Sequence, residues 1–255
     1  MCLIFLSFNQ HQKYPFIALA NRDEFYDRPA KPIHHWQGQE EIIGGKDIEG
    51  GGTWLGITTT GQFAMLTNYR DMANIKAKAP TRGKLVSNFL IARADPATYL
   101  QALNATRATY NGFNIILGSF DDPWYYSNQN NRIYRLGSGI YGLSNALLDT
   151  PWPKLIEGKA DFTAVLAKKD FKDDDLFELM TNRKMAEDHQ LPETGIGYEK
   201  EKQLSSRFIL MRGYGTRNTT LVKVDRDGNG SISEKVFDRT GSQISEKEIY
   251  FRKNN

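Results

Sequence analysis

The chain has 255 residues, of which 40% are hydrophobic, so we expect a single folded domain over residues 1–255. Its net charge is +3, and Lys and Arg are scattered among Asp and Glu. This pattern argues against nucleic-acid binding, because nucleic-acid-binding proteins usually carry clustered basic residues. No stretch approaches the roughly 18 apolar residues of a membrane span, so we expect no integral membrane segment.

Cysteine occurs once, at position 2, so no intramolecular disulfide can form. This suits a reducing compartment, and we expect a cytoplasmic protein. The only basic cluster comprises Lys76, Lys78, Arg82 and Lys84. Apolar residues interrupt it, and we interpret it as a solvated loop followed by the start of a helix.

Apolar runs predict strands in the first third of the chain. The run Cys2–Phe8 is apolar at nearly every position, which is typical of a strand covered on both faces. A turn over 11–15 and a second strand at Phe16–Ala20 follow. Two further runs, 53–58 and 62–67, lie on either side of Gly61 and predict a hairpin.

Helical spacing of apolar residues follows at 84–93 and 96–103, and Asp95-Pro96 is typical of a helix start. Strands are then predicted at 114–117, 124–127, 132–135 and 139–144, a helical block over 152–182, and strands again at 207–211, 219–224, 231–237 and 248–252. This alternation predicts an α+β fold in which helices pack outside sheets. Two sheets between two helical layers is one arrangement that fits.

Cys2 is the first candidate for chemistry. Removal of Met1 would leave it with a thiol and a free α-amine, whose pKa of about 8 lets it act as a base toward its own side chain. The alternative is an ordinary buried cysteine in an apolar strand.

Arg22 and Asp23 favour the first interpretation, because antiparallel pairing would bring the end of the second strand to the start of the first. Arginine beside a thiol lowers the thiol pKa, and a carboxylate can orient the α-amine. A structural ion pair that closes a loop is the alternative for these two residues.

Several unusual strings resemble the NRDE family, whose eukaryotic members are the Transport and Golgi organization 2 proteins. They are NRDEFYDRP (21–29), GGTWLG (51–56), LTNYR (66–70), GLSNALLDTPW (142–152) and YGTR (214–217), and together they span nearly the whole chain. The resemblance implies a four-layer αββα sandwich of the N-terminal-nucleophile hydrolase type. That fold is similar to the choloylglycine and penicillin V acylases.

Those acylases use an N-terminal cysteine, a following Arg and Asp, two asparagines and a late arginine. The comparable residues here are Cys2, Arg22, Asp23, Asn68, Asn145 and Arg217. The acylases separate their Arg and Asp by two residues, whereas Arg22 and Asp23 are adjacent, so Glu24 is an alternative to Asp23.

The resemblance implies roles for the later residues as well. Asn68 and Asn145 each follow a predicted strand, and their amides could donate to a developing oxyanion. Arg217 follows two glycines at a bend and could bind a substrate carboxylate. A turn asparagine and a surface ion pair are the corresponding structural interpretations.

Two functions of different classes follow. In the first, Cys2 attacks an amide or thioester carbonyl of a small-molecule acyl substrate, the asparagines hold the oxyanion, and water completes hydrolysis without a cofactor. In the second, the chain is a non-enzymatic heme-binding protein, because the NRDE family is associated with intracellular heme trafficking. Cys2 would then be a candidate thiolate ligand.

His34 and His35 point in opposite directions in an extended segment, which argues against a shared metal ion. One of them could still be an axial heme ligand.

Overall fold

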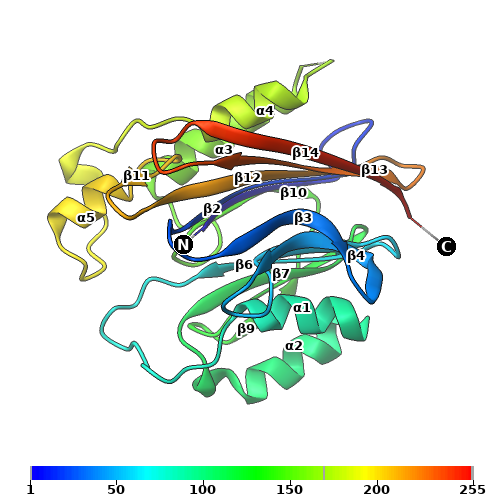
Figure 1. Cartoon of the computed structure of the whole chain (residues 1–255), viewed down its shortest axis with the longest axis horizontal. Helices are drawn as coiled ribbons and strands as arrows, with labels where there is room; N and C mark the ends of the chain where they lie inside the picture. Colours follow the sequence, from blue (N-terminus) through cyan, green and yellow to red (C-terminus); the bar gives the residue numbers. More distant parts are fainter. Residues whose placement is uncertain (1, 169, 254–255) are drawn as a thin grey trace.

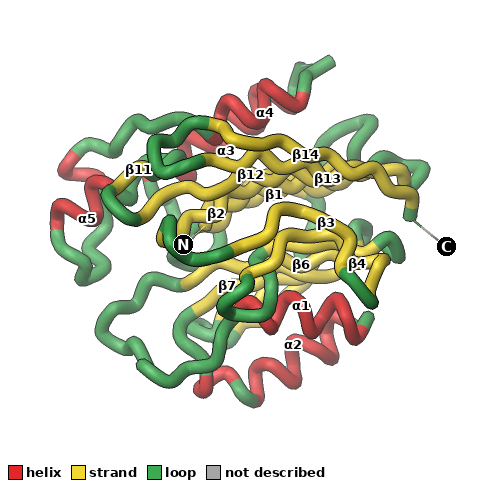
Figure 2. Tube along the Cα trace, viewed as in Figure 1, coloured by secondary structure: helices red, strands yellow, loops and turns green. Residues whose placement is uncertain are grey.

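Two antiparallel β-sheets face each other at the centre of the molecule, and helices cover the outer face of each (Figure 1). The computed structural model describes residues 2–168 and 170–253. In Figure 2 the strands form the two middle layers, and most of the helices lie outside them. The four-layer αββα arrangement expected from the sequence is therefore confirmed.

Sheet A contains the N-terminal strand at an interior position. Its spatial order is β10 (Gly139–Leu143), β1 (Cys2–Phe8), β2 (Phe16–Phe25), β12 (Tyr214–Val224), β13 (Asn229–Phe237) and β14 (Gln243–Arg252), with the short β11 (Leu210–Met211) beside β12. The outer face of this sheet is covered by α3 (Pro153–Leu166) and α4 (Asp173–Met180). A short helix, α5 (Tyr198–Gln203), precedes β11.

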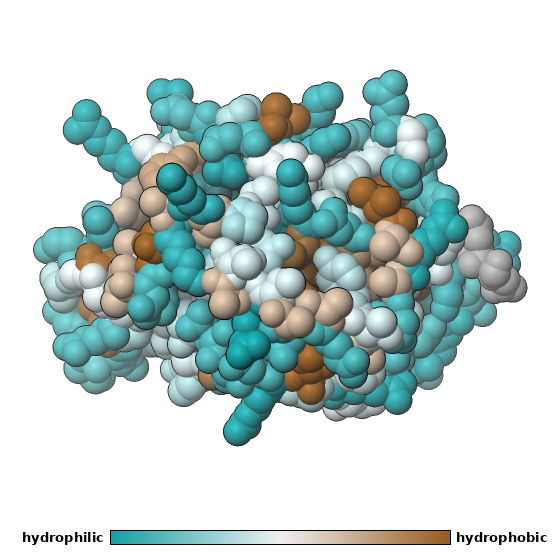
Figure 3. Space-filling model, turned by 90° about the horizontal axis from the view of Figure 1, so that it is seen from below, coloured by the Kyte–Doolittle hydropathy of each residue, from teal (hydrophilic) through white to brown (hydrophobic). Residues whose placement is uncertain are grey.

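Sheet B follows the chain from one edge to the other. Its order is β3 (Ala30–Trp36), β4 (Gln39–Asp47), β5 (Leu55–Thr58), β6 (Gln62–Asn68), β7 (Phe113–Ser119), β8 (Asp122–Ser127) and β9 (Arg132–Arg135). Its outer face is covered by α1 (Gly83–Ala92) and α2 (Pro96–Ala105). Figure 3 views the molecule from this side, and its surface is largely hydrophilic, with small, separate hydrophobic patches.

Strand β1 shows how the apolar pattern produces these layers. Leu3 and Phe5 pack with the helices of sheet A, whereas Ile4 and Leu6 pack in the space between the sheets. Both faces are covered, which is why the run is apolar at nearly every position. Because side chains alternate along a strand, Cys2 shares the inter-sheet side with Ile4 and Leu6.

Some elements differ from the sequence prediction. β3 and β4 were not predicted as strands, because their exposed positions are polar and leave little apolar alternation. The predicted strand at 207–211 is a strand only at β11. The backbone before it bonds outside a regular ladder: the side chain of Asn21 donates to the carbonyl of Arg207, and the N–H of Ile209 donates to the hydroxyl of Thr216. The N–H of Phe208 donates to the carbonyl of Asn182.

Glu234 is a buried carboxyl between the two sheets. Its Oε1 accepts the backbone N–H of Ile33 in β3 at 2.9 Å, and its Oε2 accepts the hydroxyl of Thr220 at 3.3 Å. Burial raises the pKa of Glu234 from 4.5 to about 7. The folded protein therefore holds this proton more tightly than the unfolded chain. Its stabilising contribution is complete below pH 4.5 and is lost as the pH rises through 7.

Replacing Glu234 with glutamine is expected to remove this pH dependence. Between pH 5 and pH 8, the free energy of unfolding of the wild-type protein should fall by roughly 2–3 kcal/mol relative to that of Glu234→Gln. Urea denaturation at several pH values measures the difference. The exposed Glu246 of β14 provides the control, because Glu246→Gln should follow the wild-type profile. Parallel profiles for wild type and Glu234→Gln would contradict the prediction.

Candidate active site

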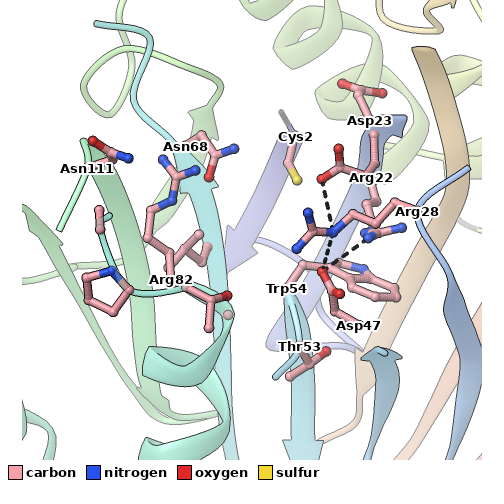
Figure 4. Close-up of a pocket in the computed structure, with 16 residues that line it drawn as sticks. Cys2, Arg22, Asp23, Arg28, Asp47, Thr53, Trp54, Asn68, Arg82 and Asn111 are labelled. Atoms are coloured by element: carbon pink, nitrogen blue, oxygen red, sulfur yellow. Dashed lines mark hydrogen bonds and ion pairs between the residues drawn. The ribbon is translucent and has the colours of Figure 1, made fainter. Parts of the chain in front are cut away.

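A cavity of about 290 Å³ lies between the sheets at the start of β1 (Figure 4). Sheet A, sheet B and the connection that leads into α1 each form part of its wall. The polar and aromatic residues that line it include Cys2, Arg22, Asp23, Glu24, Arg28, Asp47, Thr53, Trp54, Asn68, Arg82 and Asn111. Cys2 and Arg22 are register partners in the antiparallel pairing of β1 with β2. The structure thus brings the first two predicted site residues together.

Arg22 is held on the inter-sheet side by two contacts. Its guanidinium carbon lies 4.2 Å from the centroid of the Trp54 ring, and its Nη2 lies 3.6 Å from Oδ2 of Asp47. The side chain is only 4% exposed. Its Nη1 is buried and has no hydrogen-bond partner among the described residues. Arg22 is therefore a fixed positive charge beside the cavity.

Asp23 also lines the cavity, but it belongs to the opposite face of the strand, since neighbouring strand residues alternate. Its Oδ1 accepts the hydroxyl of Thr216 at 2.7 Å. Burial raises the pKa of Asp23, while the charge of Lys154 and the bond from Thr216 lower it. Glu24, the alternative to Asp23, lines the cavity as well, and its Oε2 lies 3.8 Å from Nε of Arg28.

The thiol of Cys2 is buried among these charges. Burial raises its pKa, and the charge of Asp23 acts in the same direction. The charge of Arg22 and the backbone N–H of Asp23 lower it. Because burial dominates, the thiol needs a base before it can act as a nucleophile. Met1, whose removal would create that base, lies outside the described residues.

Lys154 is a charged neighbour of the site that was not predicted from the sequence. It lies at the start of α3, is 5% exposed, and its Nζ donates to the carbonyl of Leu204 at 2.9 Å. Burial lowers the pKa of Lys154 to about 8, whereas the negative charges of Asp23 and Cys2 raise it. One signal was present in the sequence: Lys154 lies four residues before Gly158 and eight before Phe162, on the buried stripe of the helix.

The two asparagines have different positions. Asn68 ends β6 and lines the cavity, and its side-chain amide has no hydrogen-bond partner among residues 2–168 and 170–253. Asn145 is buried outside the cavity lining. Its Nδ2 donates to the carbonyl of Asn68 at 2.9 Å, and its own carbonyl accepts the N–H of Arg70 at 2.7 Å. Asn145 therefore positions the end of β6, and Asn68 presents its amide to the cavity.

Arg217 does not line the cavity. It lies at an irregularity in the pairing of β12 with β2, between Thr216 and Asn218. Its Nη1 donates to the carbonyls of Phe25 at 2.8 Å and Arg28 at 3.1 Å. In this position Arg217 closes the turn after β2, which is a structural role; substrate binding by Arg217 stays a prediction.

Arg82 reaches the cavity from the connection between β6 and α1. Lys76, Lys78 and Lys84 are exposed and Arg82 begins α1, as expected for a solvated loop and helix start, but Arg82 is half-buried and lines the cavity. Gly52 allows the start of α1 to lie close to the segment before β5, because a Cβ at Gly52 would lie 2.3 Å from the carbonyl carbon of Gly83. The glycine therefore lets the first turn of α1 pack closely against the start of β5.

His34 and His35 do not line the cavity. Their Nδ1 atoms contact the carbonyls of Pro32 at 2.7 Å and Glu40 at 2.6 Å. Among the described residues, no group of three or more His, Cys, Asp and Glu side chains is placed to hold a metal ion. In the same part of the chain, none of the helices has the length and apolar character needed to cross a membrane.

The four layers, with a cysteine opening an interior strand at an inter-sheet cavity, define a fold of the N-terminal-nucleophile hydrolase type. A mutant conjugated bile acid hydrolase from Clostridium perfringens has this fold, with a TM-score of 0.50 and 8% identity over 99% of this chain and 98% of that one. An N-acylethanolamine-hydrolyzing acid amidase ortholog from Caenorhabditis elegans is also similar, with a TM-score of 0.43 and 11% identity over 86% of this chain and 92% of that one.

The chain belongs to the Transport and Golgi organisation 2 family, whose family model matches residues 1–239. The family homologs from Bos taurus and Homo sapiens are each 38% identical to it, over 256 and 260 residues, and cover 92% of both chains in each comparison. The Drosophila melanogaster protein is 27% identical over 265 residues, which are 93% of this chain and 92% of the relative. The family resemblance predicted from the sequence is confirmed.

Proposed function

We propose that this chain is a cysteine N-terminal-nucleophile hydrolase that cleaves an amide or thioester of a small acyl compound through Cys2. The observation that carries the proposal is the place of Cys2, at the first position of an interior strand, on an inter-sheet cavity and opposite Arg22. The solved conjugated bile acid hydrolase of the same fold supports it by analogy. We keep a cytoplasmic location as part of this proposal.

The chemistry follows from the residue types. Once Met1 is removed, the α-amine of Cys2 takes the thiol proton, and the sulfur attacks the carbonyl carbon. The resulting oxyanion lies within a cavity lined by Asn68, whose amide can donate, and by Arg22, whose positive charge favours the anion. The carbon–nitrogen or carbon–sulfur bond then breaks, and the leaving group takes the proton from the ammonium. Water attacks the acyl-enzyme and releases the acid and the free thiol.

Intact mass spectrometry of natively expressed protein tests the proposal. A protein that starts at Cys2 should gain the mass of one acyl group when it is mixed with an activated thioester, and the adduct should decay as the acid appears. Since the chain has one cysteine, an adduct that maps to the N-terminal peptide and is removed by hydroxylamine is assigned to its thiol, because an amide formed on the α-amine resists this reagent. Retention of Met1, or a processed protein that forms no adduct, would refute the proposal.

Replacing Asn68 with alanine is expected to lower kcat/KM by about 10²–10³-fold, because one oxyanion donor is lost. Asn68→Asp, which keeps the shape but removes both donors, should lose as much. Steady-state kinetics with the acyl substrate measure the change. Asn130 is the control, because it lies in the β8–β9 turn and does not line the cavity. Equal activity of Asn68→Ala and Asn130→Ala would contradict the role of Asn68.

Heme binding is the second candidate, and its supporting observation is a cysteine on a cavity that could supply a thiolate ligand. A hemin titration tests it, with Cys2→Ala as the comparison. We expect a saturable Soret shift at micromolar protein that Cys2→Ala weakens. A shift equal to that of an unrelated globular protein would refute heme binding.

A further inference from the structure

The charges that line the cavity are not evenly paired. Arg28 donates from Nε to Oδ2 of Asp47 at 2.8 Å and lies 3.8 Å from Glu24. Arg22 shares the carboxylate of Asp47. Arg82 is the third arginine, and no carboxylate of the described residues lies within 4 Å of it. The cavity therefore contains one guanidinium whose charge is not neutralised by a direct partner.

Arg82 is nevertheless held in place. Its Nη1 donates to the carbonyl of Gly112 at 2.9 Å, which leaves most of its N–H groups available. The connection that carries Arg82 is fixed by Asn111, whose side chain accepts the N–H of Lys76 at 2.7 Å and donates to the carbonyl of Lys76 at 3.1 Å. A guanidinium with a fixed stem and free donors is a pre-organised binding group.

The surroundings of Arg82 add to its positive character. Arg82 is the N-cap residue of α1, it makes no side-chain cap, and the first turn of this helix contains no acidic residue. The positive end of the helix dipole therefore lies at the cavity wall. On the other side of Cys2 in Figure 4 lies Arg22, whose buried Nη1 has no partner among the described residues. Two guanidinium groups thus border the cavity that contains the thiol, and the free donors are those of Arg82.

We propose that Arg82, together with the N-terminus of α1, binds an anionic oxygen group of the substrate. The substrates would then be small acyl compounds that carry a second, negatively charged group, a carboxylate or a phosphate, which the planar fork of arginine suits. The cavity volume of about 290 Å³ accommodates a ligand of this modest size. This inference rests on the proposed function for the acyl group, but the binding of the anion can be measured without turnover.

Alkylation of the single cysteine gives the first test, because iodoacetate and iodoacetamide have the same size and differ in charge. In each reaction the sulfur of Cys2 forms a bond to carbon and iodide leaves. The ratio of the iodoacetate rate to the iodoacetamide rate should be about tenfold higher for Cys2 than for glutathione, since a charged hydrogen bond favours the anion. Arg82→Gln should return the ratio to that of glutathione, and Arg82→Lys should restore part of it. Lys78→Gln removes the same charge from an exposed position that does not line the cavity and should leave the ratio unchanged.

Equilibrium binding to Cys2→Ala gives the second test and does not depend on a reactive thiol. By calorimetry, monomethyl glutarate or methyl 3-phosphonopropionate should bind at least about tenfold more tightly than dimethyl glutarate. The tighter of the two anions identifies carboxylate or phosphate as the preferred group. Adding Arg82→Gln should abolish the preference while far-UV circular dichroism stays unchanged. Equal affinities for the three esters, or no measurable binding of either anion, would overturn the inference. An unreactive Cys2 that still binds the anion would instead refute only the hydrolase.

Discussion

A protein with alanine in place of Cys2 is expected to lose hydrolysis of the acyl substrate, with kcat/KM falling at least about 10⁴-fold. In the proposed mechanism the sulfur is the attacking atom, and the loss of a nucleophile removes nearly the whole catalytic advantage of such a site. Asn68, Arg22 and the cavity would remain, so substrate binding should persist. The experiment is steady-state kinetics combined with calorimetric binding of the substrate to the inactive variant.

The fold should tolerate this change, because only one buried sulfur is removed from the end of β1. Ser7 lies in the same strand, is also buried, and does not line the cavity, so Ser7→Ala is the matched control. It should retain wild-type activity. Cys2→Ser should be intermediate, since a hydroxyl can still be activated by the α-amine but is the weaker nucleophile. Residual activity of Cys2→Ala near the wild-type level would show that another group performs the reaction.

Replacing Arg70 with methionine is expected to lower the free energy of unfolding by about 3–5 kcal/mol. Nη1 of Arg70 lies 2.6 Å from Oε2 of Glu201, and the two side chains are 4% and 5% exposed. Removing the arginine leaves a buried carboxylate without its counter-charge. Oε1 of Glu201 accepts the backbone N–H of Thr194 at 2.8 Å, so the segment before α5 should also become more susceptible to proteolysis. Chemical denaturation and limited proteolysis measure the two effects.

A second substitution separates the ion pair from simple loss of packing. The double variant Arg70→Met with Glu201→Met should recover much of the lost stability, because no buried charge remains. Lys184 and Glu157 form an exposed pair at 3.1 Å, and Lys184→Met should change stability by less than about 1 kcal/mol. If Arg70→Met resembled Lys184→Met, the buried pair would have no special weight.

Much of the layer arrangement could be predicted because it depends on local periodicity. The nearly continuous apolar run of β1 required cover on both faces, and antiparallel pairing with β2 then placed Arg22 beside Cys2. The polar strands β3 and β4 could not be predicted in the same way, since their pairing depends on neighbours in space. The sequence strings that resemble the family contain Trp54 and Asp23. Periodicity alone does not show, however, that Arg22 would lie against the indole ring of Trp54.

The rest of the site depends on contacts between distant parts of the chain. Arg82 reaches the cavity because Asn111 binds the backbone of Lys76, which is 35 residues away in sequence. Arg217 and Asn145 matched the expected residue types, yet their side chains bind backbone carbonyls. Residue type and spacing could not distinguish a donor that faces a ligand from one that fastens a neighbouring segment.

The bond between Asn145 and the carbonyl of Asn68 joins the segment after β10 in sheet A to the end of β6 in sheet B. The bond from Ile33 to Glu234 joins the sheets a second time. Cys2 and Asn68 belong to opposite sheets, so the gap between the proposed attacking sulfur and the proposed amide donor is set by the spacing of the two layers. A bulky ligand cannot widen this gap without straining both polar ties and the apolar interior between them. The two sheets would therefore set a strict limit on the thickness of a ligand that lies between them. A broader acyl chain would have to be accommodated by a shift of the connection before α1, which forms another wall of the cavity.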